Sequence, residues 1–370
     1  MFAQSIELVN FRNYKKQCLD FGENLNVICG NNAQGKTNIL EAIFLCSAGK
    51  SHRTSKDSDM VKIGASSFFV KLLSQKQKTQ NSIEIFYRLG EGKSIRVNGK
   101  NLNRIGQLMG NLYCVIFSPE DLSLVKEGPS QRRRFIDVFL SQVKPAYFYD
   151  VQQYLKILKQ KNALLKQFEK REKLFDTIDV WNGKLAETGA RVMANRAVFT
   201  EKIACEAAAK HLAISEGKEE LTLKYKPSFD IKIKGDVSIK DIEREFITAL
   251  NKVKDKEAAQ KTALIGPQKD DIDIIIDGTN IRQYGSQGQQ RTAALAMKMA
   301  EMEVLTSETR ENPVLLLDDV MSELDSARRD LLLKNCFKAQ TFITTSGNDF
   351  ILTDFGKSTN VINIDKGNIY

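Results

Sequence analysis

Two short segments near opposite ends of the chain place the strongest limit on what it can fold into. The first fits the phosphate-binding pattern G-x-x-x-x-G-K-[ST] and consists of Gly30, Asn31, Asn32, Ala33, Gln34, Gly35, Lys36 and Thr37. The second, residues 314–319, is an apolar run that ends in the carboxylates of Asp318 and Asp319. A nucleotide polyphosphate with Mg²⁺ needs a cradle for its phosphates and an anionic anchor for the metal. If the segments form one site, both chain ends build one core, and the residues between them are additions to it.

The residues around the glycine-rich loop predict a strand, a loop and a helix, in that order. Leu25–Cys29 is mostly apolar and leads directly into the loop, and the apolar residues of 39–44 recur at helical spacing. In this context the backbone N–H groups would approach the phosphates and Lys36 would reach the β- and γ-phosphates. The Thr37 hydroxyl would coordinate Mg²⁺. The alternative interpretation is a glycine turn that binds nothing.

The acidic strand end is interpreted as the magnesium-binding part of the same site. Asp318 follows a buried run and would bind magnesium either directly or through one of the metal's own ligands, while Asp319 would face the attacking water. Alone, two carboxylates at a strand end are more often an ordinary surface pair, so the expectation depends on the loop at 30–37.

Charge and composition limit the class of protein. The net charge of +9, with 42% apolar and 27% charged residues, is that of a soluble globular protein with a basic surplus. That surplus favours a polyanionic partner, either nucleic acid or an anionic membrane surface, although a basic proteome or solubility explains it equally well. No apolar run approaches the roughly 18 residues of a membrane span. Neither a signal-peptide pattern nor a C-x-x-C pair is present, so we expect a cytoplasmic protein with reduced thiols.

The sequence pattern in the middle of the chain predicts further strands and helices added to the core. Residues 68–118 are β-rich and contain a hairpin signal at Asn98-Gly99, and helical periodicity begins near Gly128-Pro129. Residues 151–210 carry 12 Lys and Arg against 7 Asp and Glu. The resulting net charge of +5 is more than half of the chain's +9. An ordinary helical hairpin with a solvated face explains this pattern better than a binding surface does. Residues 240–260 predict another helix, and residues 272–278 predict a strand of the resumed core.

A third segment indicates the class. Residues 286–290 (SQGQQ) resemble the signature loop of the ATP-binding-cassette superfamily, which closes on the γ-phosphate held by a second protomer. The resemblance implies that Ser286, Gly288 and Gln289 contact the nucleotide, with Ser286 and the helix N-terminus as donors. Residues 322–325 (SELD) correspond to the superfamily's dimer-contacting loop. The pentapeptide alone is weak evidence, but the order of loop, insertion, signature and acidic strand end is more specific.

Longer motifs extend the resemblance over nearly the whole chain. They occupy residues 10–14, 32–38, 40–42, 50–54, 117–122, 132–137, 266–267, 270–271, 286–291 and 315–325, while Gln268 and Lys269 depart from the more basic pair that relatives often carry there. On these motifs the chain resembles the RecF family of bacterial recombination and repair proteins, relatives of the SMC and Rad50 ATPases. The resemblance implies an α/β fold with an SMC/Rad50-like P-loop ATPase head built from both chain ends, 1–120 and 263–370. A mainly helical second domain, 121–262, would be inserted between them.

The same resemblance implies a function. RecF-like proteins bind ATP with Mg²⁺, dimerise on it, bind double-stranded and gapped DNA, and act with RecO and RecR to help load recombinase. Such proteins serve recombinational repair and replication restart, and need no membrane partner. Lys36, Thr37 and Asp318 of one head would face Ser286 of the other. The shorter reach of Asp319, where transporters carry Glu, predicts slow hydrolysis used as a switch.

Two rival functions share these motifs. A transport ATPase subunit is disfavoured by Asp319, by the basic insertion, and by residues 344–346 (TTS), which replace the switch histidine of that class. A scaffold with an inactive ATP site is disfavoured because all the metal and phosphate ligands are present.

Several arginines lie in the family motifs, but the sequence does not assign a chemical role to them. Arg132, Arg133 and Arg134 either contact DNA phosphates or make a structural contact between head and insertion, and on one helix they cannot all face one way. Arg12 and Arg53 carry no predicted role.

The helical insertion is short. Sixty residues folded as a hairpin reach only about 45 Å at ~1.5 Å per residue, which is too short for an SMC arm.

Overall fold

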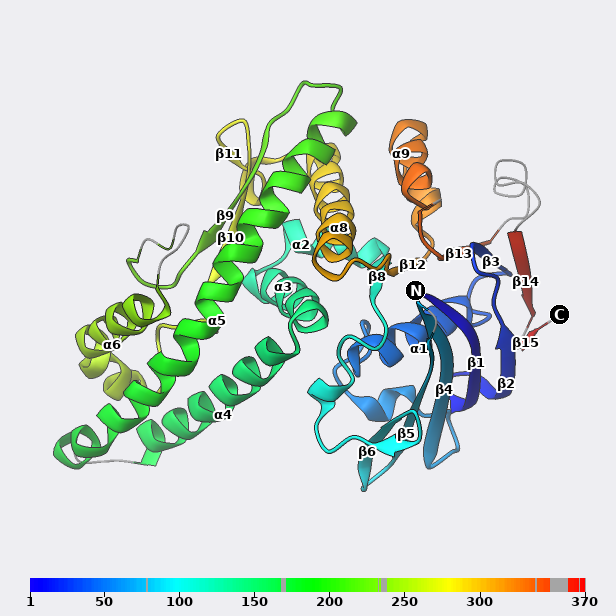
Figure 1. Cartoon of the computed structure of the whole chain (residues 1–370). Coiled ribbons are helices and arrows are strands. Elements are labelled where there is room, and N and C mark those ends of the chain that lie inside the picture. The colour runs from blue at the N-terminus through cyan, green and yellow to red at the C-terminus, as the bar shows by residue number, and fades with distance from the viewer. Residues whose placement is uncertain are drawn as a thin grey trace. The chain divides into compact units, whose positions relative to one another are not determined.

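The computed structural model describes residues 1–77, 79–167, 171–231, 233, 238–336, 338–346, 359–365 and 367–369. The chain forms two compact units, Met1–Asp121 with Lys298–Tyr370, and Leu122–Met297. The first unit is built from both chain ends, which Figure 1 shows as blue and orange-to-red ribbons. The expectation of one core made from the two ends is therefore confirmed.

A mainly parallel sheet forms the centre of the first unit. Its strands follow the order β15-β14-β3-β13-β12-β8. Their bounds are β3 Leu25–Cys29, β8 Cys114–Phe117, β12 Val314–Leu317, β13 Thr341–Thr345, β14 Thr359–Asp365 and β15 Asn368–Ile369. All residues of β3, β8 and β12 are buried, as the strands of parallel sheets usually are. Because Leu317 lies in register with both Phe117 and Ile343, the segments that follow β8, β12 and β13 emerge at one edge of the sheet.

An antiparallel sheet forms the second layer of this unit. Its order is β2-β1-β4-β5-β6-β7. The strands are β1 Phe2–Phe11, β2 Tyr14–Asp20, β4 Ser67–Lys76, β5 Thr79–Arg88, β6 Gly92–Val97 and β7 Lys100–Asn101. The predicted β-rich segment and its hairpin are confirmed, since Asn98 and Gly99 have φ of 50° and 75° between β6 and β7. Helix α1 (Lys36–Ala48) contacts β4 and β5 of this sheet and β8 and β13 of the other, which explains its almost completely buried surface.

Short helices complete the first unit. They are η1 Asp57–Met60, η2 Ile105–Gln107, η3 Pro119–Leu122, η4 Val320–Glu323 and α9 Ser326–Cys336. Among the residues placed in the structure, no helix combines the length and the apolar composition that crossing a membrane requires.

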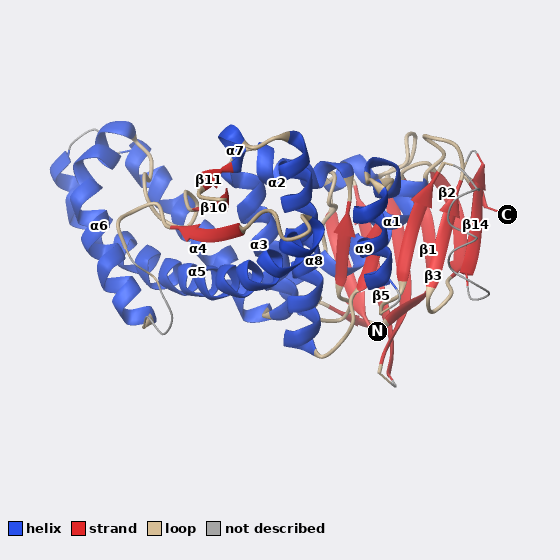
Figure 2. Ribbon diagram, turned by 90° about the horizontal axis from the view of Figure 1, so that it is seen from above, coloured by secondary structure: helices blue, strands red, loops and turns tan. Residues whose placement is uncertain are grey.

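The second unit is mainly helical with a three-stranded sheet of order β11-β10-β9. Its elements are α2 Ser123–Lys126, α3 Pro129–Val143, α4 Pro145–Gln167, α5 Arg171–Ile214, β9 Leu221–Lys226, α6 Ile239–Gln260, β10 Asp271–Ile276, β11 Thr279–Asn280 and α7 Ile281–Tyr284. Helix α8, Gln287–Thr309, begins in this unit and ends in the first. Helices α4 and α5 run side by side (Figures 1 and 2). The 44 residues of α5 span about 66 Å at about 1.5 Å per residue, longer than the hairpin expected from the sequence.

The second domain boundary differs from the expected position at residue 263. Residues 263–297 belong to the second unit, because β10 pairs with β9 from Asp271–Lys226 to Ile276–Leu221. A short strand of isoleucines and aspartates can pair in either sheet, so its sequence alone did not indicate its partner.

A buried polar cluster in the second unit joins the residues before β10 to three helices. Arg196 of α5 is 4% exposed, and its Nη1 donates to the carbonyl of Pro267 at 2.6 Å. Its Nε and Nη2 donate to the two carboxylate oxygens of Asp137 on α3, both at 3.0 Å. Tyr147 of α4 accepts from Arg196 Nε at 3.0 Å and donates to Asp137. This arginine of α5 therefore forms hydrogen bonds with groups from three other segments at once.

Candidate nucleotide site

The phosphate loop, residues 30–37, lies between β3 and α1 as predicted. Two of its glycines are sterically required. A Cβ on Gly30 would lie 2.4 Å from the carbonyl oxygen of Ile364, and one on Gly35 would lie 2.6 Å from Asn13 Nδ2. Gly35 also has φ of 115°, which L side chains rarely adopt. The backbone therefore follows a path that only glycine permits at these positions.

The structure brings the two ends of the chain together at this loop. The Thr37 hydroxyl donates to Asp318 Oδ1 at 2.9 Å across 281 residues of sequence. Lys36 is buried, and its ammonium donates to the carbonyls of Gly30 at 2.6 Å and Asn31 at 3.3 Å. The predicted lysine, threonine and aspartate thus share the carboxyl edge of the parallel sheet, where α/β folds usually bind ligands.

The electrostatics of Asp318 fit a hard cation. Burial raises the pKa of its carboxyl, and the neighbouring charges of Asp319 and Glu120 act in the same direction. Hydrogen bonds from Thr37 and Thr344 oppose that shift. A carboxylate beside a threonine hydroxyl is a pair of oxygen ligands of the kind that Mg²⁺ takes together with substrate phosphates. A divalent cation would also offset the accumulated negative charge.

Thr344, at the end of β13, is a site residue that sequence reasoning missed. Its hydroxyl donates to Asp318 Oδ1 at 2.9 Å and accepts from the backbone N–H of Asp319 at 2.8 Å. Asp319 has φ of 51°, so the chain turns sharply directly after Asp318. The signal for Thr344 was a polar residue at the end of an apolar strand, in the segment where the sequence lacks a histidine.

The turn between β1 and β2 supports the phosphate loop through two side chains. Asn13 Nδ2 donates to the carbonyl of Gln34 at 2.9 Å, and the Tyr14 hydroxyl donates to the carbonyl of Gly35 at 3.0 Å. Asn38, in the first turn of α1, donates to Asn13 Oδ1 at 2.8 Å. The loop backbone is therefore held by side chains from another strand pair.

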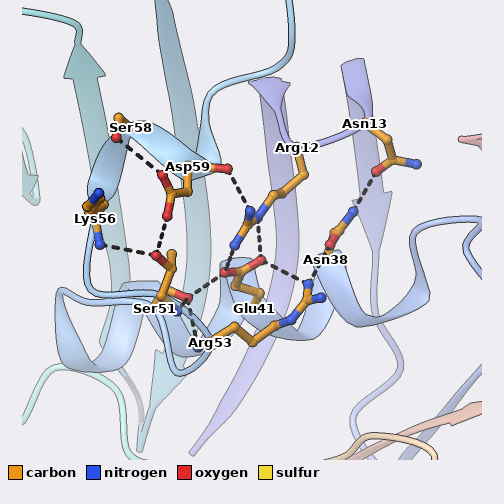
Figure 3. A network of polar contacts seen from close by, with 10 residues as sticks. Arg12, Asn13, Asn38, Glu41, Ser51, Arg53, Lys56, Ser58 and Asp59 are labelled. Carbon is orange, nitrogen blue, oxygen red and sulfur yellow. Dashed lines mark hydrogen bonds and ion pairs between the residues drawn. The ribbon is translucent and has the colours of Figure 1, made fainter.

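Arg12 and Arg53, which sequence reasoning left unassigned, converge on the buried Glu41 of α1 (Figure 3). Arg12 Nε and Nη2 donate to the two Glu41 oxygens at 2.8 and 2.5 Å, and Arg53 Nη1 lies 3.6 Å from Oε2. Burial alone would raise the pKa of Glu41, but hydrogen bonds from Arg12 and Ser51 and the arginine charges hold it below its usual value. The sequence signal was an acid among the apolar positions of α1.

The signature loop, residues 286–290, lies in the second unit at the start of α8. Ser286 Oγ accepts from the backbone N–H of Gln289 at 3.2 Å, and Gln289 Oε1 accepts from the backbone N–H of Ser286 at 2.9 Å. These two bonds form a capping box. Ser286 and Gly288 are exposed. Gln289, expected to bind nucleotide, instead uses both its amide atoms within the unit, because Nε2 donates to Glu219 Oε1 at 3.0 Å.

The arginine run at 132–134 divides between buried and exposed positions. Arg132 is 2% exposed and forms a bidentate pair with Asp271, at 2.6 and 3.0 Å. Arg133 donates to the carbonyl of Asp270 at 2.7 Å, and Arg134 is exposed. Arg132 is therefore structural, and its partner lies in the second unit rather than across a boundary between head and insertion. The buried pair with Asp271 favours the structural alternative for Arg132 over a contact with DNA phosphate.

Comparison with known proteins agrees with this architecture. The family described as RecF/RecN/SMC N terminal domain matches residues 2–368. The chain is 48% identical to the DNA replication and repair protein RecF of Acetivibrio thermocellus over 100% of both chains. It is 42% identical to RecF of Ruminiclostridium cellulolyticum, covering 100% of this chain and 99% of that protein.

Solved structures extend the comparison. A structure of "the recombination mediator protein RecF-ATP in RecFOR pathway" matches with a TM-score of 0.91 and 38% identity, over 100% of this chain and 97% of that one. The Smc head domain of Pyrococcus furiosus matches with a TM-score of 0.55 and 18% identity, over 100% and 95% of the two chains, which shows a shared fold. The chain therefore belongs to the RecF family of DNA replication and repair proteins, within the wider RecF/RecN/SMC group.

Proposed function

We propose that this chain is an ATP-dependent DNA clamp that acts as a mediator in recombinational repair and replication restart. The observation that carries the proposal is the hydrogen bond between Thr37 and Asp318, which unites a phosphate loop and an acidic strand end. The related RecF structure with ATP supports the nucleotide. In this chain the backbone of residues 30–37 would hold the phosphates, and Lys36 would exchange its carbonyl partners for phosphate oxygens.

Thr37 and Asp318 would hold magnesium, which would supply neutralisation of the phosphate charge. Asp319 would orient water. Its side chain is one methylene shorter than that of the glutamate in transport ATPases, so hydrolysis is expected to be slow and to reset the clamp.

Dimerisation would complete the site. Ser286 and Gly288 lie in the second unit, are exposed, and stand at the positive end of α8. We propose that they contact the γ-phosphate held by a second copy of the chain, as the resemblance of the signature loop implies. In this arrangement ATP joins two copies, and hydrolysis separates them.

The family and the net charge support a proposal for the nucleic-acid ligand and the partner proteins. The net charge of +9 suits a phosphate backbone, and α4 exposes lysines at Lys156, Lys159 and Lys166. We propose double-stranded DNA and gapped or single-strand junctions as ligands, RecR- and RecO-like proteins as partners, and the cytoplasm as the location. The RecFOR pathway named for the related structures supports these partners.

We expect DNA affinity to fall steeply with salt, because neutralised phosphates release counterions. Between 50 and 200 mM salt the dissociation constant should rise by at least about tenfold, measured by fluorescence anisotropy of a labelled gapped duplex. Replacing Lys156, Lys159 and Lys166 together by Ala should reduce the slope of log K against log salt by about 2 to 3 if all three contact phosphate. A flat salt profile of the unaltered chain would contradict phosphate-dominated binding.

The experiment that tests the whole proposal is sedimentation of the purified chain with ATP and Mg²⁺, with and without a gapped duplex. The expected result is an ATP-dependent dimer that retains the DNA. A monomer indifferent to ATP would remove the shared site, even if DNA still bound. A transport ATPase subunit is not favoured, because the full-length matches are to RecF proteins.

A further inference from the structure

A chain of side chains connects the end of α5 to the signature loop. His211, in the last turn of α5, is 0% exposed, and its Nε2 hydrogen bonds to Glu219 Oε2 at 3.0 Å. The other carboxylate oxygen, Oε1, accepts from Gln289 Nε2 at 3.0 Å. Gln289 Oε1 accepts in turn from the backbone N–H of Ser286 at 2.9 Å. One half-buried carboxylate thus lies between a buried histidine and the capping box of α8.

Glu219 is itself held in place by the turn that precedes β9. Its backbone N–H donates to Ser215 Oγ at 3.3 Å. The next residue, Glu220, donates to Asp277 Oδ1 at 3.0 Å and accepts from the backbone N–H of Asp277 at 3.1 Å. The turn is therefore attached to the hairpin of β10 and β11 as well as to α5. Its position is fixed independently of the signature loop.

The carboxylate decides which way the Gln289 amide points. An ionised carboxylate only accepts hydrogen bonds, so it selects the NH₂ end of Gln289. The amide oxygen then faces Ser286, and the capping box closes. Because Ser286 Oγ accepts from Gln289, its O–H remains oriented to donate elsewhere. Without Glu219 the amide could turn over, and its NH₂ end would meet the N–H of Ser286.

We propose that Glu219 is a positioning residue for the signature loop, which fixes Ser286 to receive the phosphates bound by a second copy of the chain. This assignment rests on the proposed function and adds a residue that the sequence motifs did not include. Glu219 does not touch the nucleotide. It acts through Gln289, and His211 holds the carboxylate in the required orientation.

The test compares Glu219→Ala and Glu219→Gln with a matched control, Glu216→Ala. Glu216 lies in the same turn, is exposed, and forms an ion pair with Lys218 at 2.8 Å. For Glu219→Ala, the ATP affinity should stay within about twofold of the unaltered chain when it is measured at protein concentrations too low for dimerisation. The ATP-dependent dimer should weaken by about tenfold, because one hydrogen bond to a charged group is lost. Glu219→Gln keeps a carbonyl acceptor for Gln289 and should recover most of the dimer. Glu216→Ala should behave as the unaltered chain does.

A second measurement does not depend on dimerisation. Amide hydrogen exchange at residues 287–290 should accelerate about tenfold in Glu219→Ala, with β3 unchanged. If Glu219 served general stability alone, Glu219→Ala would lower the melting temperature and Glu219→Gln would not restore the dimer. Equal dimerisation by the Glu219→Ala and Glu216→Ala variants, or unchanged exchange at 287–290, would overturn the assignment. If the unaltered chain stays monomeric with ATP, the proposed function fails, and the exchange data alone then decide whether Glu219 positions the loop.

Discussion

Replacing Lys36 by Ala is expected to abolish ATP-driven dimerisation. The Lys36 ammonium is buried under the phosphate loop and now donates to the carbonyls of Gly30 and Asn31. In the nucleotide complex it would donate to phosphate oxygens, and hydrogen bonds between charged groups contribute about 1.5–3 kcal/mol each. Loss of one or two such bonds should weaken ATP binding by about 100-fold. Dimers joined by ATP would then disappear at ordinary nucleotide concentrations.

The measurement is sedimentation with and without ATP, together with direct titration of a fluorescent ATP analogue. Lys100→Ala is the matched control, because it removes the same charge from an exposed position of the first unit. It should leave both the affinity and the dimer unchanged. Melting curves of the two variants without nucleotide would show whether Lys36→Ala simply unfolds the loop. An unchanged monomer–dimer response of a folded Lys36→Ala variant would refute the shared-site mechanism.

Arg196→Ala is expected to cause the largest loss of stability, about 3–5 kcal/mol in the free energy of unfolding of the second unit. Removing one partner of a buried ion pair leaves the other uncompensated. Here the loss would affect the carboxylate of Asp137, the hydroxyl of Tyr147 and the carbonyl of Pro267 together. The substitution would also leave a cavity between α3, α4 and α5.

The unfolding of this unit can be followed separately. The chain has a single tryptophan, Trp181, which lies on α5, so its fluorescence during urea titration reports the second unit. Arg191→Ala is the control on the same helix. Arg191 is 34% exposed and pairs with Asp150 and Glu187, so its loss should cost at most about 1 kcal/mol. Equal urea midpoints for the two variants would show that the buried cluster does not hold this unit together.

Local elements of both units were predictable because their signals lie within a few residues. The strand Leu25–Cys29, the glycine loop and the start of α3 at Pro129 each follow from adjacent residues whose backbone preferences agree. The union of the chain ends was predictable for a chemical reason. A phosphate cradle and a magnesium anchor would be useful only together, and the bond between Thr37 and Asp318 places the two candidate segments side by side.

The remaining features depend on partners far away in the sequence. Whether an arginine binds DNA or a carboxylate is decided by what lies beside it, and Arg132 meets Asp271 across 139 residues. Helical position alone showed only that the arginines of 132–134 could not share one direction. The same applies to Arg12 at Glu41 and to Glu219 at Gln289, where no local pattern identifies the partner.

The sequence by itself therefore predicted the glycine-rich loop, the acidic strand end and the β-rich segment, because spacing and residue chemistry encode them locally. It predicted the assembly of one core from both ends because the chemistry of the loop and that of the acidic strand end are complementary. Only the tertiary structure decided that residues 263–297 join the second unit, since β10 pairs with β9 and not with the parallel sheet. It also decided that Thr344 completes the surroundings of Asp318 and that Gln289 closes a capping box. The physical reason is that strand pairing and buried hydrogen bonds are satisfied by whichever group the fold brings near, and sequence spacing does not specify that group.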